Sequence, residues 1–233
     1  MCSRSLNATA SSKLTMSDWL AWQVVDSTFP VGVFAHSWGL ESAWQSGHVP
    51  DSRALQRFLD ASIQQTGYGG LPLLNAAYRR PERWRGLDEL ADAFLINSVA
   101  NRASRVQGRT LAATAVRVWP SEAMTTVSQH AAVGRAHVAP LSGLIFKVIG
   151  LSLETARNIM LYGAARGVLS AAVRLGIVGS YEAQRMQYQA GPRLDLIHDD
   201  CRALGDEDVC QTAPILDLLQ AGHDRLYSRL FQS

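Results

Sequence analysis

The chemically reactive side chains of this chain include two histidines that have serines close by in the sequence. His36 is followed directly by Ser37, and Ser142 lies five residues after His137. A serine hydroxyl becomes a nucleophile when a histidine base lies within hydrogen-bonding distance. Adjacent residues of a helix point about 100° apart, so Ser37 is better interpreted as a helix cap beside His36. A helical hydrolase that uses His36 or His137 with Ser37 or Ser142 is therefore an alternative supported by residue types alone.

Metal binding is a second kind of chemistry that the residue types allow. His198 and Cys201 lie one helical turn apart, and Cys210 follows them. Such residues can bind a metal only when the fold holds them in a fixed geometry. The acidic segment between Cys201 and Cys210 is typical of a solvent-exposed turn, and neither His36 nor His137 has a second ligand at a suitable spacing. We therefore expect no metal site.

Common local signatures of catalysis and nucleotide binding are absent from the sequence. It contains no G-x-S-x-G, G-x-x-x-x-G-K-[ST], H-E-x-x-H or C-x-x-C motif. The cluster at 67–70 reads G-Y-G-G, which lacks the later glycine of a dinucleotide-binding loop and follows no strand. We interpret these glycines as the end of a helix. The residues alone therefore indicate no catalytic site.

Composition narrows the class of protein further. The 233 residues are 47% hydrophobic and 18% charged, which is typical of a globular protein. A formal net charge of +2 lacks the strong positive field of a dedicated nucleic-acid-binding protein. Three cysteines are too few for a disulfide framework. This low number favours a location in a reducing compartment, the cytoplasm. No apolar run approaches the roughly 18 residues that span a membrane.

The N-terminal residues 1–16 are interpreted as a flexible segment. They lack the apolar core of a secretory signal peptide. They contain Arg4 and Lys13 but no acidic residue, so an organellar transit peptide is a minor alternative.

The elements that position these side chains are predicted mainly from the spacing of apolar residues, which is typical of helices along most of the chain. The spacing of apolar residues predicts a helix over 87–99, and a second helix over 156–168 has a stripe of small residues that we expect to be buried. Further helix starts are predicted from capping residues or prolines: Ser17, Ser37, Asp51, Pro72, Ser121, Pro140, Ser180 and Thr212. Alternating strand patterns are nearly absent. The sequence therefore predicts an all-α protein with about ten helices.

One helical domain is expected to contain nearly all of these helices. We place it at 17–210, between the flexible segment 1–16 and a C-terminal helix and tail over 211–233.

Four segments resemble the UreF family of urease accessory proteins. They are F-P-V-G-V-F-A-H-S-W-G-L-E at 29–41, H-V-A-P at 137–140 with Gly143, S-A-A-V-R-L-G at 170–176 continuing to E-A-Q at 182–184, and the C-terminal H-D-R-L-Y-S-R-L-F-Q-S at 223–233. Their order matches the family from about Trp19 to the end of the chain. The chain departs from the family at Val33, where a second glycine is common.

The resemblance implies an all-helical, homodimeric scaffold of urease maturation. Proteins of this kind bind a UreD/UreH-type protein and the GTPase UreG, and the assembly helps to deliver nickel to apo-urease. UreF-like proteins are not established catalysts, so we expect a non-enzymatic protein without a stably bound cofactor, in which the accessory complex handles the nickel. A diverged UreF-like protein that acts without urease is a second alternative.

The C-terminal tail has the residue types of a docking segment. Tyr227, Leu230 and Phe231 offer apolar anchors, and Arg225 and Arg229 offer forked donors. We hypothesise that this tail, which ends at Ser233, is mobile in the free protein and becomes ordered on the UreD/UreH-type partner. The alternative is that it packs on the protein's own core.

Four further residues of the matching motifs are candidates for partner binding. Arg174 follows a small apolar run, so it either forms a buried ion pair or helps to shape a surface offered to UreG. His36, Glu41 and Gln184 belong to the same motifs, although His36, Glu41 and His137 could each simply cap or brace a helix.

Overall fold

A computed structural model describes residues 15–31 and 35–232 of the chain. Within these residues every regular element is helical, which confirms the all-α prediction. The first six α-helices are α1 (Met16–Val25), α2 (Leu40–Gln45), α3 (Ser52–Gln65), α4 (Leu71–Arg79), α5 (Trp84–Phe94) and α6 (Ser98–Val118). The others are α7 (Glu122–Val133), α8 (Val138–Val148), α9 (Leu153–Arg174), α10 (Ser180–Gln189), α11 (Gly191–Cys201) and α12 (Pro214–Ala221). Val33 lies outside the described residues.

Several helix starts follow the predicted caps. The Asp51 carboxylate accepts a hydrogen bond from the Ala54 amide at 2.8 Å and begins α3. The Ser121 hydroxyl accepts one from the Met124 amide at 3.1 Å and begins α7. Gly47 follows the end of α2 with φ +78°, as expected for a glycine that closes a helix.

Two predicted N-caps are wrong. The cap of α1 is Thr15, which exchanges hydrogen bonds with Asp18, so Ser17 lies inside the helix. The prediction that Ser37 opens a helix fails because α2 begins only at Leu40, after Gly39 in the left-handed conformation with φ +84°.

The predicted helix over 87–99 is two helices. α5 ends at Phe94, and Asn97 begins α6 by accepting a hydrogen bond from the Val99 amide at 3.0 Å. The glycines at 67–70 also differ from the prediction, because they form a π-helical turn (Thr66–Gly70) that continues α3 into α4. A β-carbon on Gly67 would lie 2.2 Å from an Ile197 methyl group, so the absence of a side chain lets α11 pack closely there.

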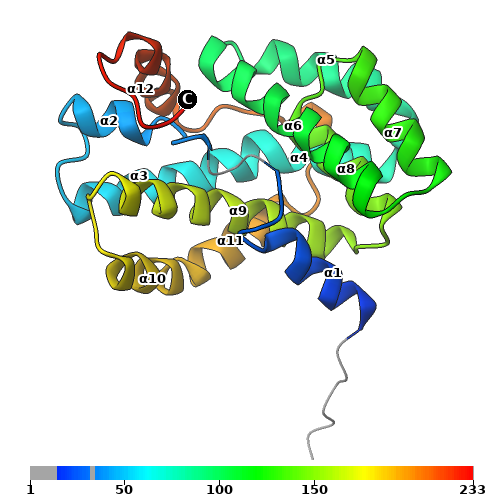
Figure 1. Ribbon diagram of the computed structural model, residues 1–233, viewed down its shortest axis with the longest axis horizontal. Coiled ribbons are helices and arrows are strands. Elements are labelled where there is room, and N and C mark those ends of the chain that lie inside the picture. Colours follow the sequence, from blue (N-terminus) through cyan, green and yellow to red (C-terminus); the bar gives the residue numbers. More distant parts are fainter. Residues whose placement is uncertain (1–14, 32–34, 233) are drawn as a thin grey trace, which may run out of the picture.

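The helices enclose two neighbouring apolar clusters, which Figure 1 shows as two groups of helices on either side of the centre. The first cluster joins α2, α3, α10, α11 and the C-terminal part of α9, and the second joins α4 to α8. The 22-residue α9 runs between the groups, and Met160 on α9 packs against both clusters. Its stripe of small residues is buried where Gly167 contacts the Trp38 ring. α9 therefore links the two halves of the core.

No helix of the described residues is both long enough and apolar enough to cross a lipid bilayer.

Candidate interaction site

The Glu41 carboxylate holds the C-terminal tail against the protein. Glu41 is 1% exposed on the short helix α2, and a buried carboxylate is stable only when donors surround it. His223 Nε2 lies 3.1 Å from Glu41 Oε2. The Leu230 amide donates to Oε1 at 2.6 Å, and the Phe231 amide donates to Oε2 at 3.2 Å. One carboxylate thus fixes two segments that follow α12.

Further contacts extend this attachment along the tail. The Gln45 side chain donates to the Ser228 carbonyl at 3.1 Å, and the Gln232 amide donates to the Ala35 carbonyl at 2.8 Å. The Phe231 ring is 6% exposed and forms part of the first apolar cluster. The Arg174 guanidinium lies 4.2 Å from the centre of that ring, a cation–π contact.

These contacts decide between some of the interpretations of the tail. The tail packs on the protein's own core, as in the alternative to a mobile tail. The Phe231 ring is buried in that core and is not free to contact a partner. Arg174 is exposed at the end of α9, so its guanidinium is not buried, and its part in a surface offered to UreG stays a prediction. Whether the tail detaches to bind a partner stays a prediction.

The other predicted partner-binding residues fall into two groups. Five are exposed, and their role stays a prediction: Gln184, Arg225, Tyr227, Arg229 and Leu230. Arg229 lies 3.6 Å from Asp224, which also pairs with Arg102 at 2.8 Å. His36 and Glu41 are buried, so they can act on a partner only through the residues they support. Ser233 lies outside the described residues.

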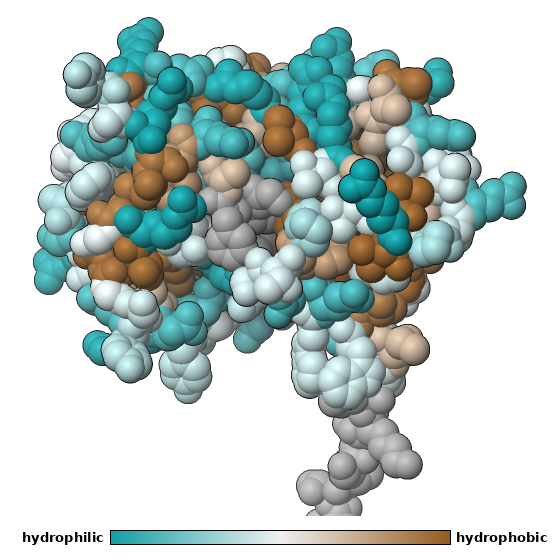
Figure 2. Space-filling view, viewed as in Figure 1, coloured by the Kyte–Doolittle hydropathy of each residue, from teal (hydrophilic) through white to brown (hydrophobic). Residues whose placement is uncertain are grey.

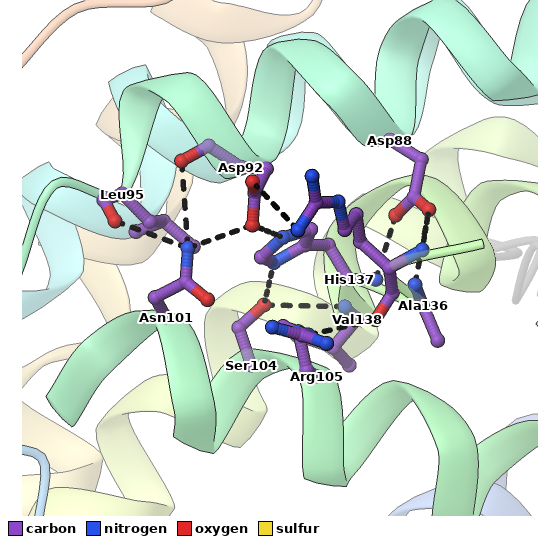
Figure 3. Close-up of polar contacts among 10 residues, drawn as sticks. Asp88, Asp92, Leu95, Asn101, Ser104, Arg105, Ala136, His137 and Val138 are labelled. Atoms are coloured by element: carbon purple, nitrogen blue, oxygen red, sulfur yellow. Dashed lines mark hydrogen bonds and ion pairs between the residues drawn. The ribbon is translucent and has the colours of Figure 1, made fainter. Parts of the chain in front are cut away.

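A second polar cluster surrounds the start of α8 (Figure 3). The Asp88 carboxylate of α5 accepts three backbone hydrogen bonds, from the amides of Arg135 at 2.6 Å, Ala136 at 3.0 Å and His137 at 2.8 Å. Ala136 has φ +68°, an uncommon conformation for a residue with a side chain. Asp88 therefore holds a strained turn in place.

The His137 ring connects α5 and α6 beneath this turn. Its Nε2 lies 3.1 Å from Asp92 Oδ1 and its Nδ1 lies 3.1 Å from the Ser104 hydroxyl. The ring is fully buried, and burial lowers the pKa of His137, although Asp92 and Asp88 oppose this shift. The pKa of Asp92 is lowered chiefly by a hydrogen bond from Asn101.

This arrangement contains the serine, histidine and aspartate of a hydrolase, but it is better suited to bracing the fold. The hydroxyl beside His137 belongs to Ser104, not to the predicted Ser37 or Ser142. The Val138 amide already donates to the Ser104 hydroxyl at 3.3 Å, and the histidine has no exposed surface. A nucleophilic serine needs free donors that stabilise the oxyanion of its intermediate. Ser104 escaped the sequence reasoning because it lies 33 residues from His137.

The two candidate histidines line one apolar cavity of about 290 Å³ between α3, α6, α8 and α9. His36 is 4% exposed there, and burial lowers its pKa to about 4, with smaller contributions from electrostatic interactions with His223 and Arg102. His36 is therefore neutral at physiological pH. The fold brings His36 and His137 to the same cavity, although about a hundred residues separate them.

Metal ligation has weak support among the described residues. They contain no group of three or more histidine, cysteine or acidic side chains arranged around a common point. His198 Nε2 accepts a hydrogen bond from Arg157 Nε at 3.2 Å, which occupies one ligand atom. Burial raises the pKa of Cys201 to about 11, so this residue is a thiol at neutral pH in the metal-free protein.

Comparisons with known proteins cover most of the chain. The UreF family model matches residues 49–191. A "Urease accessory protein F" of Oryza sativa subsp. indica is 35% identical over 91% of this chain and 84% of its own. One from Arabidopsis thaliana is 35% identical over 92% of both chains. A "Urease accessory protein UreF" of Trichodesmium erythraeum is 29% identical over 90% of this chain and 94% of its own.

Proposed function

This chain belongs to the UreF family of urease accessory proteins, and we propose that it is a non-catalytic scaffold for nickel insertion into apo-urease. It binds a UreD/UreH-type protein and recruits the GTPase UreG. The nickel is the cargo of the assembly, and no cofactor is held stably by this chain. In this proposal the protein is a cytoplasmic homodimer.

The observation that carries this proposal is the match to curated urease accessory proteins over about nine tenths of the chain. Their printed name describes proteins that assist urease. Two features of the structure support a scaffold rather than a catalyst. The histidine beside a serine and an aspartate is buried within a brace, and several aromatic, aliphatic and arginine side chains of the tail are exposed.

The attached tail provides a preformed surface for a partner. Tyr227 is fully exposed and Leu230 is 52% exposed, while Glu41 holds the backbone beside Leu230. A surface that is already ordered loses little conformational entropy on binding. Tyrosine and arginine are enriched among the residues that contribute most to interfaces. The UreD/UreH-type protein therefore contacts Tyr227, Arg229 and Leu230 in this proposal.

Light scattering coupled to size exclusion tests the assembly directly. The protein is mixed with the UreD/UreH-type and UreG-type proteins of the same organism, and a larger stoichiometric complex is expected. If the three folded proteins elute separately, the proposed function fails and the chain is better regarded as a diverged UreF-like protein. Nickel equilibrium dialysis of the isolated protein is expected to show no stoichiometric binding.

A matched pair of variants tests the tail. The double variant Tyr227→Ala/Leu230→Ala is expected to bind the UreD/UreH-type protein about tenfold or more weakly, because it removes two exposed anchors. The control Tyr181→Ala/Leu196→Ala changes the same residue types at other exposed positions and should bind normally. Equal affinity of both double variants would exclude the tail from the interface.

A further inference from the structure

Helix α6 presents a basic seam to solvent. The α6 seam consists of Arg102, Val106, Arg109, Ala113 and Arg117, all of which are exposed. At 3.6 residues per turn these five positions fall within about 80° of one another, so they form one straight face along the helix. On the face shown in Figure 2, hydrophilic side chains are common in the upper part of the molecule, with smaller hydrophobic patches among them.

The charge of this seam is only partly balanced by the protein itself. α6 contains four arginines and no acidic residue over its 21 positions. Arg102 pairs with Asp224 at 2.8 Å, and Asp224 also lies 3.6 Å from Arg229. Among the described residues, Arg109 and Arg117 have no carboxylate within 4.0 Å. The seam therefore has two exposed guanidinium groups without an acidic partner among the residues that the structure describes.

The opposite face of α6 is closely packed against the rest of the protein. A β-carbon on Gly108 would lie 1.9 Å from the Ala136 carbonyl oxygen, so the backbone of α6 touches the turn before α8. Leu111, Ala112 and Ala115 are also buried in the second apolar cluster. A rigid helix presents its exposed side chains in a fixed geometry, which lowers the entropic cost of docking.

We propose that the α6 seam docks an acidic amphipathic helix of a protein partner. Its spacing of four, three, four and four residues is the pattern by which one helix packs along another. Val106, which is 40% exposed, and Ala113 stand between the arginines and provide apolar contact at close approach. Arginine forks pair with carboxylates through two parallel hydrogen bonds, so acidic residues at matching positions fix the register.

A protein helix fits the seam better than a polyanion such as nucleic acid or an anionic membrane. The first and last of the three arginines are 15 positions apart, or roughly 22 Å at 1.5 Å per residue, with Val106 and Ala113 between them on the seam. Phosphate backbones require a denser row of positive charges and gain nothing from valine or alanine. The formal net charge of only +2 also provides little long-range attraction for a polyanion.

The inference rests on the proposed function, because it assigns the acidic helix to one of the other proteins of the assembly. The test uses the variant Arg109→Glu/Arg117→Glu and the control Arg53→Glu/Arg57→Glu, which changes two exposed arginines of α3 by the same charge. Dissociation constants for the UreD/UreH-type and UreG-type proteins are measured in 50 and 300 mM salt. One partner is expected to bind the seam variant about tenfold or more weakly in low salt, with a smaller salt dependence.

The two possible failures give different results. If the wild-type protein binds neither partner, the proposed function fails. If the wild-type protein binds and the seam variant binds equally well, the inference alone is overturned. The neutral variant Arg109→Gln/Arg117→Gln, which avoids new charges on α6, provides the same test if the glutamate variant has an altered circular dichroism spectrum.

Polyanion binding is the remaining outcome to distinguish. A fluorescent 20-base-pair DNA duplex and phosphatidylserine vesicles are added separately to the wild-type protein at 150 mM salt. Micromolar binding of either probe that the seam variant loses would assign the seam to a polyanion and overturn the inference. A glutamate-to-lysine change in the partner helix that restores binding of the seam variant would establish direct contact.

Discussion

Asp88 is the residue on which the turn before α8 depends. Asn is nearly the same size as Asp, but it loses the charge and presents an amide group to backbone amides that also donate. We expect Asp88→Asn to lower the free energy of unfolding by about 2–4 kcal/mol, since three charge-assisted hydrogen bonds are disrupted. Urea denaturation followed by circular dichroism measures the loss. The exposed Asp195→Asn should change stability by less than about 0.5 kcal/mol, and a similarly small effect at Asp88 would contradict the bracing role.

His36 makes the stability of the protein depend on pH. Its pKa is about 4 in the folded state and near 6.5 when unfolded. Between these values the unfolded chain binds a proton that the folded protein excludes, so stability falls as pH decreases from about 6.5 to 4. The contribution lost by pH 4 is about 3 kcal/mol. His137 and His130, whose pKa values are also lowered by burial, act in the same direction.

The measurement is the free energy of unfolding of wild type and His36→Gln between pH 7.5 and 4.5. We expect a shallower decline in the variant, because glutamine does not titrate. The exposed His48→Gln should retain the wild-type slope. Parallel curves for all three proteins would show that His36 does not govern the pH dependence.

Residue-level chemistry could be predicted from the sequence only where partners are local. The Asp51 cap was predictable because its acceptor and donor lie three residues apart. The contacts of Asp88 with the turn before α8 join residues 47 to 49 positions apart, so no pattern of neighbouring residues could predict them. Glu41 could be identified as a possible brace, but its bonds to the tail span 189 and 190 positions.

At the level of elements, the close contact between α6 and the turn before α8 depends on the absence of a side chain at Gly108. We expect Gly108→Ala to destabilise the protein by about 2 kcal/mol or more, because the new methyl group would overlap the Ala136 carbonyl and force α6 away. Gly86→Ala is the matched control, since Gly86 is exposed in α5 and a β-carbon there would meet no described atom within 4 Å beyond its chain neighbours and the backbone of its own helix. Its higher helix propensity should stabilise the protein by up to about 1 kcal/mol. Thermal denaturation compares the two, and equal melting temperatures would refute the close contact.

The attachment of the tail is tested by hydrogen exchange. The amides of Leu230, Phe231 and Gln232 all donate hydrogen bonds within the protein, so they should be protected in the free protein. Glu41→Gln should make these amides exchange about tenfold or more faster, because the amide group replaces one acceptor oxygen with a donor. The exposed Glu89→Gln is the control. Rapid exchange of the wild-type tail would favour the mobile tail expected from the resemblance.

Helix types were easier to predict than helix boundaries. Apolar periodicity correctly predicted helical structure throughout 87–94 and 156–168. The break between α5 and α6 was missed because Asn97 interrupts a run whose apolar spacing continues. The π-helical turn at 66–70 was missed because its glycines are explained by close packing against α11 and not by local helix propensity.

At the level of the whole molecule, α9 determines whether the two apolar clusters unfold together. Leu161 is 1% exposed on α9 in the first cluster, one residue after Met160, which packs against both. A shared helix couples the clusters, since the first cannot lose its packing on α9 without freeing the helix that covers the second. The sequence indicated a single domain, but it could not show that two clusters exist or which helix joins them.

Leu161→Ala tests this coupling. The cavity it leaves should lower the free energy of unfolding by about 2–5 kcal/mol. If the clusters unfold as one unit, the slowest-exchanging amides of α8 and of α10 will lose protection by the same free energy, although only α10 belongs to the cluster of Leu161. The exposed Leu196→Ala should leave both helices unchanged. A loss of protection confined to α10 would instead mean that the clusters are separate folding units joined by a helix that can fray from one end.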